Sequence, residues 1–383
     1  MRFKLGRPDL ARYSDRFDAP AAAGAGARTP LSVTWLGVAT LLLDDGSSAL
    51  MTDGFFSRPS LVRVGARRLT PSAARVDGCL ARAKVSRLEA VIPTHAHFDH
   101  VLDSALVADR TGATLVGGES TANVGRGYGL PAERIVLAAP GSPISLGAFE
   151  VTLIASHHCP PDRFPGVIEA PVRPPARASA YRCGEAWAML VAHRPSNRRV
   201  LIQGSAGFVA GTLAGQRAEV AYLSVGQLGV QPRSYLVDYW TETVRAVGAR
   251  RVILIHWDDF FRPLSKPLRA LPYAADDLDV SMAVLSELAA SDGVALHLPT
   301  VFRQEDPWAY VAPVARADAK SASALTGNLG QNHTRRDRGV QRFCVARHRN
   351  GHDLVAVLPH QPGQPLALRT DHQHQRVGGV QVV

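Results

Sequence analysis

The chain has 383 residues, of which 46% are hydrophobic and 20% charged, a balance typical of a globular protein with one large domain or two ordinary ones. No apolar run approaches the roughly 20 residues that cross a bilayer, and residues 1–28 lack the apolar core of a signal peptide. We therefore expect no transmembrane segment and a cytoplasmic protein. The four cysteines show no paired spacing, which argues against a disulfide framework.

The formal net charge of +10 would suit a nucleic-acid partner, but its distribution argues against one. Residues 306–383 carry nine Arg and one Lys against five Asp, so 10 − 5 = +5, half of the excess, lies in this tail. The remaining excess is spread along the chain without a Lys/Arg block. We expect a small-molecule substrate, which the positive charge would allow to be anionic, and no nucleic acid; the oligomeric state is not indicated.

In chain order, residues 1–30 are polar and interrupted by prolines, which predicts an extended arm. Residues 31–305 then read as one domain, opening with three β-prone runs in which Asp45-Gly46 is a hairpin signal. The expected strands cover 32–36, 39–43, 49–52, 88–92, 114–116, 134–137, a hairpin over 144–154, 186–192, 199–203, 220–225, 252–255 and 294–298. The expected helices cover 72–83, 101–109, 120–127, 235–247 and 280–290.

This order of elements is rich in strands with helices between them, and its two halves look alike. A sheet buries its apolar face against another layer, so we expect an α/β (α+β) fold of two mixed sheets packed face to face, with helices outside. Residues 306–383 are rich in Arg, Gln and Gly, a composition that predicts disorder. The Pro- and Arg-rich segment 159–179 is too irregular for a connector and forms either a lid or a surface excursion.

One stretch, 94–100, reads Thr-His-Ala-His-Phe-Asp-His and holds four candidate metal ligands: His95, His97, Asp99 and His100. It follows an apolar run and Pro93, which places it on a loop at the carboxyl end of a strand. A divalent cation such as zinc takes about four nitrogen, sulfur or oxygen ligands. Alternation along an extended loop puts His95 and His97 on one side and turns the other two away, so two cations ~3.5–4 Å apart can be held.

This motif resembles the signature of the metallo-β-lactamase fold superfamily, and the similarity extends from about Val33 to Pro299. The opening residues 33–37, Val-Thr-Trp-Leu-Gly, together with Thr52-Asp53, are similar to the ascorbate-6-phosphate-lactonase-like and phosphatidylethanolamine-phospholipase-D-like branches. The resemblance implies a four-layer αββα sandwich with its metals at one edge between the sheets, in agreement with the order of strands and helices.

The resemblance also implies ligands far from the motif. His158 takes the place of the third ligand of the first metal, with His157 as the alternative, and His256 takes the place of the last ligand of the second. Ser205 stands where the family usually has a bridging aspartate, which removes an anionic ligand. Asp99, His100 and His256 still offer three ligands for the second ion, so we favour two divalent ions, with one as the alternative. Zinc suits the histidine-rich set, and manganese and iron are the other candidates.

The resemblance and the ligand set together imply a hydrolase in which a metal-bound hydroxide attacks an ester, a lactone or a phosphodiester. Asp99 would orient that hydroxide, and Asp53 would support a ligand histidine. The alternatives are a nuclease of the same fold and a non-hydrolytic protein that binds or senses metal. Four arginines near segment 159–179 are candidates for contact with an anionic group: Arg163, Arg173, Arg177 and Arg182.

Overall fold

The computed structural model describes residues 4–17, 30–309, 311, 345–347 and 353–355. The chain divides into two compact units, Met1–Val314 and Ala315–Val383. In the second unit, strands β15 (Val345–Arg347) and β16 (Asp353–Val355) form an antiparallel pair. The rest of that unit lies outside the described residues, and so the expected disorder of the tail stays a prediction.

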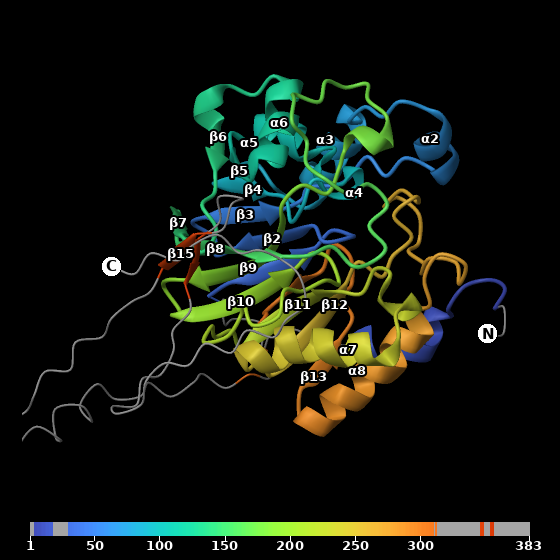
Figure 1. Ribbon diagram of the computed structural model, residues 1–383. Coiled ribbons are helices and arrows are strands. Elements are labelled where there is room, and N and C mark those ends of the chain that lie inside the picture. Colours follow the sequence, from blue (N-terminus) through green and yellow to red (C-terminus); the bar gives the residue numbers. More distant parts are fainter. Residues whose placement is uncertain (1–3, 18–29, 310, 312–344, 348–352, 356–383) are drawn as a thin grey trace, which may run out of the picture. The chain divides into compact units, whose positions relative to one another are not determined.

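The first unit is an αββα sandwich, as expected (Figure 1). Two seven-stranded sheets pack face to face, and one large hydrophobic cluster draws its buried side chains from both of them. The first sheet consists of β14 (Gln304–Glu305), β1 (Ser32–Trp35), β2 (Leu41–Asp44), β3 (Ala49–Thr52), β4 (Ala90–Ile92), β5 (Thr114–Gly117) and β6 (Ile135–Leu137), in this order. The second consists of β13 (Ala295–His297), β12 (Arg251–Ile255), β11 (Val220–Ser224), β10 (Arg198–Gln203), β9 (Ala186–His193), β8 (Phe149–Ser156) and β7 (Pro143–Leu146).

Both sheets are mixed in the same way. In the first, β3 to β6 pair in parallel and the remaining neighbours are antiparallel. In the second, β10 to β13 pair in parallel and β7 to β10 are antiparallel. This arrangement explains the likeness between the two halves of the sequence.

Helices cover the two outer faces of the sandwich (Figure 1). On the first sheet they bury a second apolar cluster that includes Val76, Leu80 and Leu106. The helices on that side are α2 (Leu61–Ala66), α3 (Ala73–Arg82), α4 (Phe98–Val101), α5 (Ser104–Thr111) and α6 (Glu119–Tyr128). On the second sheet lie α7 (Arg233–Trp240), which continues as a π-helical turn (Thr241–Arg245), and α8 (Leu278–Asp292).

Among the described residues of the first unit, short 3-10 turns occupy four further places: Leu10–Tyr13, Ala132–Arg134, Ala178–Ala180 and Leu228–Val230. None of the described helices is long and apolar enough to cross a bilayer.

The two ends of the predicted domain differ from expectation. The arm is not extended throughout, because Leu10–Tyr13 and α1 (Ser14–Phe17) are helical, and Phe17 packs edge-on against Trp257 at 5.6 Å between ring centroids. At the other end, Trp308 and Val311 belong to the main hydrophobic cluster beyond residue 305. In both places, apolar side chains too widely spaced to form a clear pattern contact the sandwich.

Candidate metal centre

The carboxyl ends of strands from both sheets meet at one edge of the sandwich. Asp53 follows β3, the stretch 94–100 follows β4, and His158 and His256 come after β8 and β12. Hydrogen bonds tie the two sheets together at this edge, since Trp187 N–H donates to Thr94 O at 2.9 Å and His256 N–H to Val38 O at 2.9 Å. Strand ends therefore bring the predicted residues together from four places in the sequence.

The first group of candidate ligands consists of His95, His97 and His158, whose nearest nitrogen atoms all lie within 4.8 Å of one another. His95 Nε2 and His97 Nδ1 are 3.1 Å apart, and the ring centroids of His97 and His158 are 4.6 Å apart. Two ligands at 2.0–2.1 Å from one tetrahedral zinc lie roughly 3.4 Å apart, so this spacing suits an ion.

The second group consists of Asp99, His100 and His256, and its ligand atoms also lie within 4.8 Å of one another. Asp99 Oδ2 is 3.6 Å from Nε2 of His100 and 3.6 Å from Nε2 of His256. The rings of His95 and His100 approach to 3.8 Å between centroids, so the two groups are neighbours. The structure therefore brings together the six residues that the sequence proposed as ligands.

The ionisation of the first group also suits metal binding, because a cation binds neutral imidazole. Burial lowers the pKa of His95 well below its ordinary value, and the neighbouring imidazoles act in the same direction. Burial likewise lowers the pKa of His97, and it lowers that of His158 to about 4. These three side chains are thus held unprotonated at neutral pH.

The second group is anchored by carboxylates. Burial opposes the charged form of His100, but Asp53 and Asp99 raise its pKa above the ordinary value. Burial also opposes the charged form of Asp99, yet His100 and His256 lower its pKa overall, so it is ionised at neutral pH.

Asp53 has the position that a supporting residue needs. Its Oδ2 lies 2.7 Å from His100 Nδ1, which leaves Nε2 of that ring for an ion, and its Oδ1 accepts the Thr94 N–H at 2.7 Å. Asp53 has a left-handed backbone with φ of +53°, and so does His256 with φ of +61°. Strained residues of this kind cluster at functional sites. The predicted support of a ligand histidine by Asp53 fits this geometry.

The choice between the paired histidines follows from their positions. His158 is partly buried beside His97, and its Nδ1 lies 2.6 Å from the Cys159 carbonyl, which leaves Nε2 for an ion. His157 is exposed and belongs to none of the ligand groups among the described residues. The geometry therefore favours His158.

Ser205 lies at the same edge and lines the cavity there, but its hydroxyl is engaged with the backbone. Its Oγ accepts the Cys159 N–H at 2.9 Å, next to His158. The serine thus braces the chain beside a candidate ligand.

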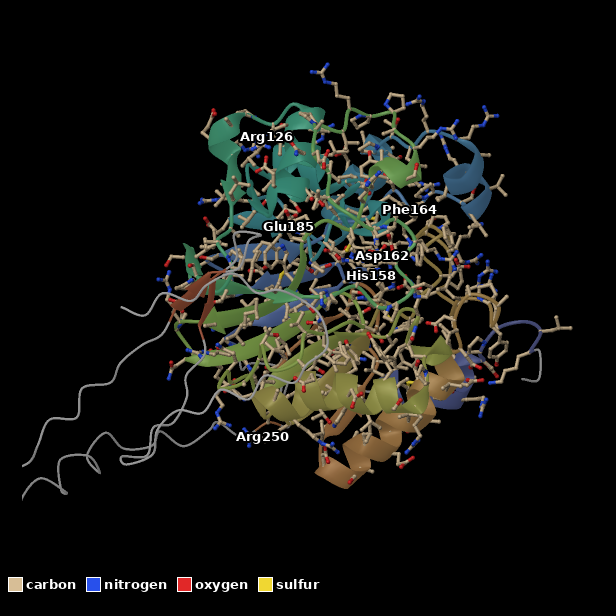
Figure 2. All side chains as sticks on the ribbon, in the orientation of Figure 1. Arg126, His158, Asp162, Phe164, Glu185 and Arg250 are labelled. Carbon is tan, nitrogen blue, oxygen red and sulfur yellow. The ribbon has the colours of Figure 1, made fainter. Side chains whose placement is uncertain are left out.

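Some residues of the site were not anticipated from the sequence. Asp162 Oδ1 lies 3.1 Å from His97 Nε2, and the Phe164 carbonyl lies 3.3 Å from the same nitrogen. Cys183 joins His97 and Asp162 as a third group of candidate ligand atoms, but burial strongly raises the pKa of its thiol. Figure 2 shows Asp162 and Phe164 near His158, on the segment between β8 and β9. Nothing in the irregular segment 159–179 marked these two residues.

Asp258, two residues after His256, and the buried His193 serve the scaffold. Asp258 forms a fully buried ion pair with Arg58 and accepts the Val38 N–H at 2.9 Å. His193 ends β9 at the edge opposite to Ala186, where the strand begins near the ligands, and its ring contacts Ser196 and Asp45.

Comparisons with known proteins give a family match for part of the chain. Residues 33–171, about a third of the chain, match the model of the metallo-beta-lactamase superfamily. A UPF0173 metal-dependent hydrolase of Anaeromyxobacter sp. (strain K) is 29% identical over 136 residues, which are 34% of this chain and 44% of that protein. One from Myxococcus xanthus is 31% identical over 140 residues, 36% of this chain and 40% of that protein. The chain thus spans less than half the length of these curated relatives.

Among solved structures, Igni18, described as a novel metallo hydrolase from the archaeon Ignicoccus hospitalis, is 14% identical, with a TM-score of 0.46 over 72% of this chain and 97% of that one. The family match, the ligand motif and the αββα architecture point to one conclusion. Over residues 33–171 this chain is similar to the metallo-β-lactamase superfamily, and its two-sheet sandwich is the fold that this similarity implies.

Proposed function

We propose that this protein is a metal-dependent hydrolase that acts on a small molecule with an ester, lactone or phosphodiester linkage. The proposal depends on one observation: the two neighbouring groups of candidate ligands face the same cavity. His97 and His158 of the first group and Asp99 and His256 of the second all line it. A divalent cation held in such a group supplies a Lewis acid and lowers the pKa of water to about 7. The relatives that match about a third of this chain are named metal-dependent hydrolases, which supports a hydrolytic activity.

Asp99 is the carboxylate best placed to orient the attacking water in this reaction. It belongs to the second group and lines the cavity, and its lowered pKa keeps it ionised at neutral pH. An ionised carboxylate there can orient an attacking water by accepting a hydrogen bond from it. Asp53 lies behind His100 and away from the cavity lining, so its role is to position that ring.

Zinc is the metal we propose, with two ions bound. The first group offers only imidazole nitrogen, which suits zinc, and the second adds one carboxylate. With Ser205 in place of an anionic bridge, we expect the ion at Asp99, His100 and His256 to be held more weakly than the other.

Two adjacent histidines provide a matched test. The purified protein, His158→Ala and His157→Ala would be compared by elemental analysis and by turnover of a panel of aryl esters, lactones and phosphodiesters. We expect about two zinc ions per chain in the wild type, and loss of metal and turnover together in His158→Ala. His157→Ala should keep both. Turnover that survives complete metal removal, or a wild type without bound metal or turnover, would overturn the proposal.

A further inference from the structure

The size and lining of the cavity at the two ligand groups restrict which substrates can bind there. Its volume is about 700 Å³, within the usual range of pockets for small molecules. Residues from α2, from the segment around Phe164 and from residues 256–275 form its walls, together with the strand ends that carry the ligands. A substrate with its reacting bond at the ligands must therefore place its remaining atoms against these walls.

Most of those walls are apolar, and aromatic rings stand directly beside both ligand groups. The Phe260 ring lies 5.6 Å from that of His256, edge to face, and the Phe164 ring lies 6.3 Å from that of His97. Further out, four aliphatic or aromatic side chains continue the apolar wall: Leu61, Val64, Phe261 and Leu271. An apolar group attached close to the reacting bond would lose its water shell here.

The same cavity also presents positive charge. Arg7 and Arg269 both pair with Asp259, each at 3.0 Å, so two cations share one carboxylate. Arg163 also lines the cavity; it is exposed and has no hydrogen bond or ion pair with any other described residue. Of the four arginines proposed from the sequence to meet an anion, Arg163 is the one in this lining. The lining thus has cationic groups available for an anion.

Hydroxyl and amide groups are few in this lining: Ser60, Ser205, Ser224 and Gln227. Ser205 is already engaged by the Cys159 N–H. A polyhydroxylated substrate such as a sugar needs several polar partners, and leaving its hydroxyls unpaired in an apolar pocket costs free energy. The walls therefore disfavour sugar-like substrates.

Taking the proposed hydrolase function as its basis, we infer that the substrate is an amphiphilic ester with an apolar acyl or aryl group and one anionic group. The reacting carbonyl would lie at the ligands, the apolar group against Phe164, Phe260 and Val64, and the anion near Arg163. Hydrolysis adds water across the acyl C–O bond, so that the products are a carboxylic acid and an alcohol.

Probe binding tests this inference without any need for turnover. The probes are 8-anilinonaphthalene-1-sulfonate, which is apolar and anionic, and N-phenyl-1-naphthylamine, which is similar but neutral. We expect one cavity site for each and displacement by octanoate but not by acetate. Val64→Trp, which fills the cavity, should weaken both probes by about tenfold or more, whereas Val62→Trp on the exposed side of α2 should not.

The charge is tested by a second matched pair. Arg163→Gln should weaken the anionic probe by about fivefold and leave the neutral probe unchanged, because only the sulfonate gains from the guanidinium. Arg173→Gln removes an exposed arginine of the same segment that is not in the lining and should change neither. Equal loss of both probes in Arg163→Gln, or no effect of Val64→Trp, would overturn the inference.

Turnover separates this inference from the proposed function. In a series of aryl esters, kcat/KM should rise by roughly threefold for each added acyl methylene until the cavity is filled. Hydrolysis that is independent of chain length would support the proposed function and overturn the substrate class. Probe binding as expected, without hydrolysis of any ester by the zinc-loaded protein, would support the apolar anion site and overturn the hydrolase.

Discussion

The two ligand groups lie side by side, but they are supported in different ways. Asp99, His100 and His256 depend on the framework, because Asp53 follows β3 directly and holds His100, while the backbone of His256 is hydrogen-bonded to Val38. His95, His97 and His158 depend more on the segment between β8 and β9. In this segment Cys159 contacts the ring of His158, and Asp162 and Phe164 contact the ring of His97.

This difference suggests a division of roles within the site. Strand ends hold their side chains rigidly, so the second group should keep its geometry whatever the substrate does. The first group shares Phe164 with the cavity wall, so a substrate that presses on this wall also contacts the chain that orients His97. We expect substitutions behind the two groups to differ in their effect on substrate binding.

The largest expected effect is that of His97→Ala, which removes a ligand from the first group. Zinc at this group should be lost and kcat/KM should fall by about 10³-fold or more, since a three-ligand set becomes two. The sandwich should stay folded because the ring lies at its edge. Metal analysis, kinetics and circular dichroism check this; full metal content in the variant would contradict the assignment of His97.

Asp53→Asn should have the next largest effect and should fall on the second group. The amide keeps an acceptor for Thr94 N–H but loses the charge that supports His100. Loss of such a supporting carboxylate typically costs about 10- to 100-fold in metal affinity. Zinc titration should show one of two ions weakened by this amount, with KM unchanged. Equal weakening of both ions would argue against two separately supported groups.

Asp162→Asn should have a smaller effect, and a different one. The Phe164 carbonyl remains near His97 Nε2 after the carboxylate is gone, so we expect zinc at the first group to weaken by only about three- to tenfold. Because Asp162 and Phe164 belong to one segment, KM should rise as well. Glu169→Gln, an exposed acid of the same segment, is the control. An unchanged KM in Asp162→Asn would contradict the coupling of this group to the cavity wall.

The sequence by itself indicated the layers of the fold and the candidate metal ligands. The alternation and length of apolar runs indicated nearly every strand, because strands buried between two layers need apolar side chains. The run from His95 to His100 indicated a metal site, because three imidazoles and a carboxylate so close together in sequence serve no packing purpose.

Only the tertiary structure showed how the distant candidate residues come together and which neighbours contact them. It buries His158 more than His157, places Asp162 beside His97, and brings Arg163, but not the other three candidate arginines, into the cavity lining. These choices depend on the path of the irregular segment 159–179, which has no periodicity from which side-chain direction could be read. The cavity could not be predicted from the sequence either. Its walls come from segments far apart in the chain, which form a common surface only when the two sheets pack together.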